Sequence, residues 1–181
     1  LGINVPRVFV TRACQISDGF PYFVHLLSHH VFFEVFEHIE TSNDTTSEDF
    51  HAATKSAISV AEYELREKYA EAVRNAKNSM DYEEVLWSFS DGLHFERQIR
   101  QVYDGTYLPL MANRGRSAQP SVDDEAAAAP PLNYNDFSAR VRRLQNPEHG
   151  AILISPRRSW YRFCENRLRG YIRMVAQAHG V

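Results

Sequence analysis

The most apolar stretch of the chain runs from Gly19 to Phe36, and its pattern predicts a helix. Aliphatic residues recur there at helical spacing, at Val24, Leu27, Val31 and Val35. Aromatic side chains widen the apolar stripe until little of the circumference is polar. Pro21 falls in the first turn, where a missing N–H costs nothing, and Asp18 is a candidate N-cap. We therefore expect a central helix that other helices cover.

Polar segments on both sides of this helix predict further helices. Residues 6–17 form a short amphipathic pattern that should pack on the central helix. After a run of turn-forming residues, Thr46 and Asp49 approximate a capping box. No glycine or proline occurs from Ser47 to about Lys77, which predicts one long connecting helix.

The next part of the chain alternates helix signals with breaks. Asp81 is a candidate cap for a helix, Asp91-Gly92 predicts a turn, and a helix should run from about Leu93 to Asp104. A shorter piece follows, broken near Pro109. Residues 113–131 contain almost nothing to bury, so we interpret them as a loop or linker.

In the last 50 residues the hydrophobic pattern changes from helical spacing to short β-prone runs. A helix capped by Asn133 or Asn135 should precede two β-prone runs, Ala151–Ile154 and Trp160–Phe163, and Ser-Pro-Arg-Arg-Ser between them predicts a hairpin. A final helix should extend from about Asn166 to Ala178. Helix, helix, helix and hairpin is the order of a winged helix-turn-helix. The sequence therefore predicts a mainly α fold, in which a helical subdomain precedes a winged helix-turn-helix with a C-terminal β-hairpin.

Composition and charge narrow the class of protein. With 44% hydrophobic and 24% charged residues, no 20-residue apolar run and no signal peptide, the chain reads as a soluble, cytoplasmic protein that does not contact a membrane. Cys14 and Cys164 stand outside any metal or redox spacing, so two reduced thiols are expected. Residues 1–131 carry a net charge of −9 and residues 132–181 one of +6, which suggests a basic module that meets phosphate or an acidic partner.

Two segments resemble parts of a known family. Ser17-Asp-Gly-Phe-Pro-Tyr-Phe-Val-His-Leu-Leu27 resembles the start of a lid helix in AAA+ ATPases of the initiator-like and STAND-like P-loop group, and Leu1-Gly-Ile3 with the stretch to Ile16 resembles the preceding lid helices. Trp160–Phe163 and Leu168-Arg-Gly-Tyr-Ile-Arg173 resemble the wing and closing helix of the same group.

The resemblance covers residues 1–40 and about 81–178. It implies lid-like helices over 1–40, a connecting segment over 41–80, and a winged-helix domain over 81–181 with 113–131 as an insertion. It also implies that the chain begins inside a larger protein, after an N-terminal ATPase core.

The family binds ATP and Mg²⁺, but this chain lacks the phosphate-binding loop. No Gly-Lys pair occurs, and no hydrophobic strand ends in paired carboxylates. The resemblance makes Gly19, Pro21 and Tyr22 a lining for the nucleotide, with Tyr22 where many relatives carry an arginine. We expect neither ATP hydrolysis nor tight ATP binding by this chain alone. No nucleophile elbow is present either, so the sequence argues for no reaction of its own.

The histidines of the apolar stretch allow a metal interpretation. His25 and His29 are four residues apart, as are His30, Glu34 and His38, so each set could face one ion. No His-Glu-x-x-His motif and no obvious further ligand accompany them. We expect no metal site, and read these residues as polar positions on a buried helix.

Arginines are the strongest functional signal. Arg140, Arg142 and Arg143 lie on the helix before the hairpin, and Arg157 and Arg158 lie at its tip. Beside Trp160 and Tyr161 they predict contact with duplex DNA. The alternative is a helical protein-interaction module without nucleic-acid binding, in which arginines such as Arg142 or Arg162 pair with acidic neighbours. A homo-oligomer of the full-length protein is a further possible partner.

Overall fold

The computed structural model describes residues 2–74, 80–91, 94–113 and 130–181, and the fold is mainly helical. The first part contains α1 (Arg7–Ile16), α2 (Pro21–Glu37), α3 (Ser47–Val60) and α4 (Tyr63–Val73). The second contains α5 (Asp81–Ser90), β1 (Arg97–Gln98), α6 (Ile99–Val102), the π-helical turn η1 (Tyr103–Tyr107), α7 (Leu108–Asn113), α8 (Tyr134–Arg143), the 3₁₀ turn η2 (Pro147–His149), β2 (Leu153–Arg157), β3 (Trp160–Phe163) and α9 (Asn166–Ala178).

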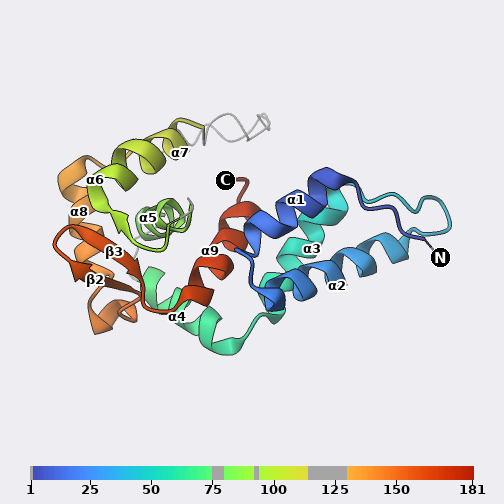
Figure 1. The fold of residues 1–181 in the computed structure, drawn as a ribbon, viewed down its shortest axis with the longest axis horizontal. Helices are drawn as coiled ribbons and strands as arrows, with labels where there is room; N and C mark the ends of the chain where they lie inside the picture. The colour runs from blue at the N-terminus through green and yellow to red at the C-terminus, as the bar shows by residue number, and fades with distance from the viewer. Residues whose placement is uncertain (1, 75–79, 92–93, 114–129) are drawn as a thin grey trace.

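The helix at the centre of the molecule is α9. It contacts α1, α3, α4 and α5, and Figure 1 shows it between the two ends of an elongated fold. Leu168, Ile172 and Met174 are fully buried, and the buried side chains of both halves form one continuous hydrophobic cluster. The two halves therefore share a core through α9.

The helix predicted between Gly19 and Phe36 is present, with Pro21 at its start, but two expectations about it are wrong. Its N-cap position is Phe20, without a side-chain cap, and Asp18 instead adopts a left-handed backbone conformation with φ 54°. Other helices cover only one side of α2, because it lies at the edge of the fold and packs mainly on α3 (Figure 1). Phe33 and Phe36 are accordingly 57% and 59% exposed.

The single long helix predicted from Ser47 is two helices, α3 and α4. The Thr46–Asp49 capping box that begins α3 is confirmed, but the chain turns at Ala61 and Glu62, where the backbone is extended. The hydroxyl of Tyr22 accepts a hydrogen bond from the Glu62 N–H at 3.1 Å, which satisfies a donor that the break would expose. A contact across the fold therefore stabilises the break after α3, at a point where the sequence has no glycine or proline. Lys77, the expected end of the long helix, lies outside the described residues.

The helix predicted over Leu93–Asp104 is also wrong in its first half. Arg97 and Gln98 form β1 and pair with Tyr161 and Trp160 of β3, so the helix begins only at Ile99. Leu93 lies outside the described residues, as do 114–129 of the predicted 113–131 loop.

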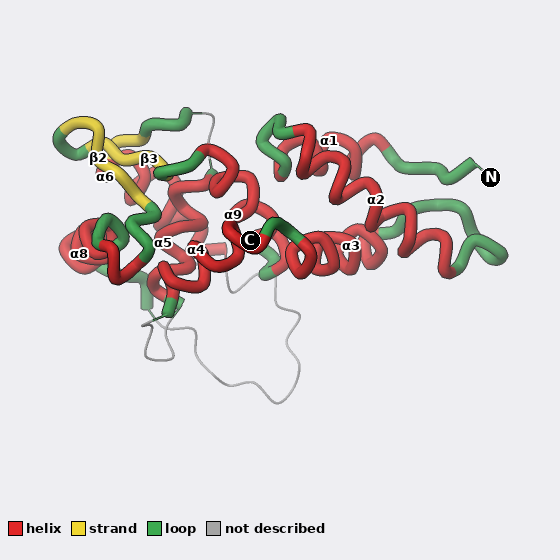
Figure 2. Tube along the Cα trace, turned by 90° about the horizontal axis from the view of Figure 1, so that it is seen from below, coloured by secondary structure: helices red, strands yellow, loops and turns green. Residues whose placement is uncertain are grey.

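The C-terminal predictions are confirmed in outline. Asn133 caps α8 by accepting a hydrogen bond from the Asp136 N–H at 3.0 Å, and α9 has the expected bounds. The hairpin is present (Figure 2), but β2 runs from Leu153 to Arg157 instead of Ala151–Ile154, so Arg157 lies in the strand and not in the turn. The antiparallel sheet has the order β1-β3-β2.

Candidate nucleic-acid interface

Helix α8 buries one face and exposes another. Phe137, Val141 and Leu144 are fully buried, and the exposed positions of α8 and the turn after it include Asn135, Arg142, Arg143 and Asn146. Asn135 and Arg142 are seven residues apart and share one side of the helix, and so do the exposed Asp136 and Arg143. The outward side of α8 therefore carries two arginines, an amide and one carboxylate.

The three arginines of α8 have different surroundings. Arg140 is partly buried, donates to Asp81 at 3.0 Å and lies over the Tyr82 ring, 5.4 Å from its centroid, so it joins α8 to α5. Arg143 donates to the Tyr82 hydroxyl at 3.4 Å, and Arg142 donates within its own helix, to the Ser138 carbonyl at 3.3 Å. Of these three arginines, Arg142 and Arg143 therefore have no ion pair with a carboxylate among the described residues.

The hairpin presents a basic outer face. Side chains alternate along β3, so that Tyr161 and Phe163 face the core while Trp160 and Arg162 face outward. Arg157 lies over the Trp160 ring, 3.9 Å from its centroid, and 3.9 Å from the Glu96 carboxylate. Arg158 is exposed in the turn.

The α8 face and the hairpin lie close together. Burial raises the pKa of the Tyr161 hydroxyl on β3, and the positive charge of Arg142 on α8 opposes that shift. Figures 1 and 2 both place α8 and the hairpin at the end of the molecule opposite the N-terminus. This arrangement presents several cations and an aromatic ring that can contact a polyanion. The described residues of this surface include no arrangement of a nucleophile with a general base.

Ion pairing sorts the arginines of the C-terminal part. Arg167, Arg169 and Arg173 each contact a carboxylate, as Arg140 does. Within residues 2–74, 80–91, 94–113 and 130–181, no carboxylate pairs with Arg142, Arg143, Arg158 or Arg162. The structural pairing considered for Arg142 and Arg162 is thus not found in that part of the chain. Arg162 was not among the predicted contact residues, although its two-residue spacing from Trp160 was a signal for a shared face.

The two segments that carry the family resemblance meet in space. Asp18 accepts hydrogen bonds from Arg169 Nε at 2.6 Å and from Arg173 at 2.7 Å, and the Asp18 and Arg169 side chains are 8% and 5% exposed. Beside this contact, a Cβ built on Gly170 would lie 2.9 Å from the Phe23 ring, so only glycine allows α9 to approach α2 this closely. The α1–α2 turn and α9 are therefore locked together.

The predicted nucleotide-lining residues are close neighbours with separate surroundings. Gly19 is exposed and has φ 75°, and Pro21 is the first residue of α2. The Tyr22 hydroxyl accepts a hydrogen bond from the Glu62 N–H. Neither described cavity is lined by them. Their contact with nucleotide stays a prediction.

The histidines of α2 make ordinary side-chain contacts. His38 pairs with Asp49 at 3.0 Å, and the His29 and Phe33 rings are 4.7 Å apart. Within the described ranges, no group of three or more histidine, cysteine, aspartate or glutamate side chains is arranged to hold a metal ion. Cys14 and Cys164 are both free.

Comparison with protein families, with curated proteins and with solved structures finds no match to this chain. Among the helices that the structure describes, none combines the length and the apolar character needed to cross a bilayer.

Proposed function

We propose that residues 81–178 form a winged helix-turn-helix that binds duplex DNA. The order of elements supports this proposal: a helix (α5), a short strand (β1), a second helical segment (α6 to α7), a third helix (α8), and a hairpin whose second strand pairs with β1. In this arrangement α8 takes the recognition position and the β2–β3 hairpin is the wing.

The observation that carries the proposal is the set of arginines without carboxylate partners. Arg142 and Arg143 on α8 and Arg158 and Arg162 on the hairpin hold no acidic side chain in the described part of the chain, and all four are exposed. A cation that neutralises a phosphate releases condensed counterions, and this release drives DNA binding. Asn135 on α8 and Asn146 in the turn after it are exposed and add amide groups that can hydrogen-bond to base edges or phosphates.

A binding assay with paired double variants tests this proposal. We expect Arg158→Ala with Arg162→Ala to weaken binding of a fluorescent random-sequence duplex of about 20 base pairs at least roughly 10-fold, because two phosphate contacts are lost. The control is Arg7→Ala with Arg74→Ala, which removes the same charge from two exposed arginines outside the proposed DNA-binding region. Equal losses in both double variants, or no loss in either, would contradict specific use of the wing.

We further propose that residues 1–40 correspond to the lid of an AAA+ ATPase in the cytoplasm, with 41–80 as the connecting segment, acting beside an ATP-binding core outside this chain. The contact of Asp18 with Arg169 and Arg173 supports this, since it joins both segments that resemble the family. ATP and Mg²⁺ would bind mainly in that core, and homo-oligomers would form there. Residues 1–181 alone should show no ATP turnover, and turnover abolished by Tyr22→Ala would overturn this assignment.

One observation favours the alternative function, a protein-interaction module. The outer side of α2 exposes Phe32, Phe33 and Phe36, each by more than half, and exposed apolar patches often mark protein contacts. If that is the main activity, duplex binding should be weak and indifferent to the wing variants.

A further inference from the structure

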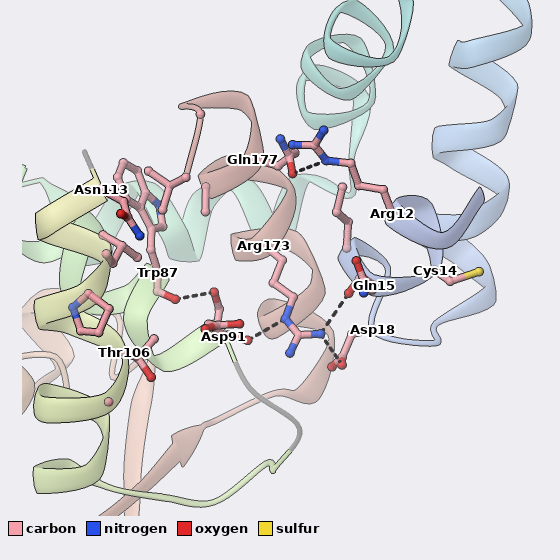
Figure 3. A pocket seen from close by; sticks show the side chains of 18 residues that line it. Arg12, Cys14, Gln15, Asp18, Trp87, Asp91, Thr106, Asn113, Arg173 and Gln177 are labelled. Carbon is pink, nitrogen blue, oxygen red and sulfur yellow. Dashed lines mark hydrogen bonds and ion pairs between the residues drawn. The ribbon is translucent and has the colours of Figure 1, made fainter. Parts of the chain in front are cut away.

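A cavity of about 840 Å³ lies between α1, α9, α5 and the η1–α7 segment (Figure 3). It differs from the basic surface because its walls mix apolar, amide and charged side chains of both signs, the charged ones being Arg12, Asp18, Asp91 and Arg173. Its volume falls within the range typical of ligand sites in proteins.

The apolar part of the wall comes from the core. Trp87, only 3% exposed, lines it together with Ile16, Leu110 and Ala176. These residues come from four different elements, so their relative positions depend on the whole fold. Such a surface accepts an apolar side chain of a ligand.

The polar part of the wall is rich in primary amides and contains a guanidinium. Gln15, Asn113 and Gln177 line the cavity, and Figure 3 shows Asn113 on the α7 side with Arg12 and Gln15 on the α1 side. A primary amide both donates and accepts hydrogen bonds, as a peptide group does, so the two are complementary.

Two lining arginines differ in their surroundings. Arg173 contacts Asp18 at 2.7 Å, which offsets its charge. Arg12 donates through Nε to Gln177 at 2.9 Å, and no carboxylate among the described residues pairs with it. Arg12 can thus take a carboxylate of a ligand in a charge-assisted, two-pronged hydrogen bond.

The wall formed by η1 is a separate indication of function. Residues Tyr103–Tyr107 form a π-helical turn, a conformation that occurs mostly as single turns and frequently at functional sites. It contributes Gly105 and Thr106 to the cavity. A Cβ built on Gly105 would meet no atom within 4 Å, so the space beside this residue is open.

We propose that this cavity binds a short peptide segment in which an apolar side chain neighbours a carboxylate. The apolar side chain lies against Trp87 and Leu110, the carboxylate pairs with Arg12, and the amides of Gln15, Asn113 and Gln177 bond to the peptide backbone. This site is independent of DNA binding, since none of the arginines assigned to DNA lines it.

Tryptophan fluorescence provides the test. The chain has two tryptophans, so Trp160→Phe leaves Trp87 as the reporter inside the cavity. The probes are acetylated, amidated tetrapeptides Ala-X-Glu-Ala with X as Ala, Leu or Phe, each matched by a Gln version. We expect saturable quenching or enhancement at up to about 1 mM for Leu or Phe with Glu, and roughly 10-fold weaker binding for the Gln versions.

Two variants in the same background locate the site. Arg12→Gln should remove the preference for Glu over Gln, and Gly105→Leu should abolish binding by filling the open space, whereas Gly105→Ala should retain it. A thermal melt of each variant checks folding, and Arg12→Gln gives an answer even if Gly105→Leu is unstable. The absence of any saturable signal, or binding that ignores Arg12→Gln and a folded Gly105→Leu, overturns the proposal.

Discussion

At the residue scale, Asp49 serves two neighbours at once. One carboxylate oxygen accepts hydrogen bonds from the Thr46 N–H and hydroxyl at 2.8 and 2.9 Å, and the other faces His38 Nε2 at 3.0 Å. Burial alone would raise the pKa of Asp49, but the hydrogen bonds from Thr46 and His38 outweigh burial and lower it. The hydrogen bond to Asp49 raises the pKa of His38 above 6.5.

These shifts predict a pH window for the pair. The raised pKa of His38 means that its contribution is complete below 6.5 and is lost as pH rises through the folded-state value, while the lowered pKa of Asp49 means loss only in acid, below 3.8. The difference in unfolding free energy between the unmutated chain and His38→Gln should therefore be larger at about pH 5.5 than at about pH 8.5. Urea unfolding at both pH values measures it, with His51→Gln on α3 as the control. A gap that widens in alkali would contradict the assignment.

Single residues also show what a sequence can and cannot reveal. Pro21, the Thr46–Asp49 box and Asn133 were predictable, because each acts on backbone groups within three or four positions. Asp18 was expected to cap α2 for the same reason. Its actual partners, Arg169 and Arg173, lie some 150 positions away, and no local pattern encodes that contact.

At the element scale, α2 is a helix with two apolar sides, of which only one is packed against the rest of the fold. Phe23, Leu27, Val31 and Val35 face α3 and the core, while Phe32, Phe33 and Phe36 point away from it. Because the sequence of α2 is apolar almost all round, it predicts that other helices cover every side. The sequence alone could not show which side of α2 stays exposed to solvent. The aromatic outer side remains available for a partner.

Matched truncations distinguish the two sides of α2. Leu27→Ala should lower the free energy of unfolding by about 2–5 kcal/mol, because Leu27 is 1% exposed and its removal leaves a cavity. Phe33→Ala, at a position 57% exposed, should cost less than about 0.5 kcal/mol. Chemical denaturation of both variants measures this contrast. Similar losses would mean that the outer side of α2 is packed after all.

Other elements also differ in whether nearby residues or distant contacts determine them. The bounds of α9 and of β3 were predictable from periodicity and turn chemistry within each segment, whereas β2 begins two residues later than predicted and extends to Arg157. β1 is only two residues long, and its identity depends on pairing with β3 more than 60 positions later. The break between α3 and α4 is stabilised by a hydrogen bond to Tyr22, 40 positions earlier, and no local pattern predicted it. The sequence could show where the arginines of the candidate interface lie along the chain. It could not show which of them form ion pairs with carboxylates.

At the scale of the whole molecule, α9 joins the N-terminal helical half to the half that carries the candidate nucleic-acid interface. Its Arg169 and Arg173 hold Asp18, and its Gly170 lets α2 approach. This contact makes the two halves one unit, so disturbing it should weaken the entire fold rather than one end.

The variant Asp18→Asn tests that coupling. Asparagine tolerates the left-handed backbone of residue 18, so the change removes charge without backbone strain. Leaving the buried Arg169 guanidinium without its carboxylate should cost about 3–5 kcal/mol in unfolding free energy. Glu64→Gln, at an exposed carboxylate, is the control. Calorimetry should show one transition shifted downward, and an unchanged transition would remove the Asp18 contact from the account.

The salt dependence of duplex binding tests the central claim most directly. If Arg142, Arg143, Arg157, Arg158 and Arg162 contact phosphates, the logarithm of the binding constant should fall with the logarithm of salt concentration at a slope of about −4.5, which is about −0.9 for each contact. Replacing Arg157 and Arg158 by alanine should flatten this slope by nearly two units, because the hairpin tip is exposed and its loss leaves the fold intact. A flat profile for the unmutated chain, or an unchanged slope in the variant, would contradict DNA binding by this surface.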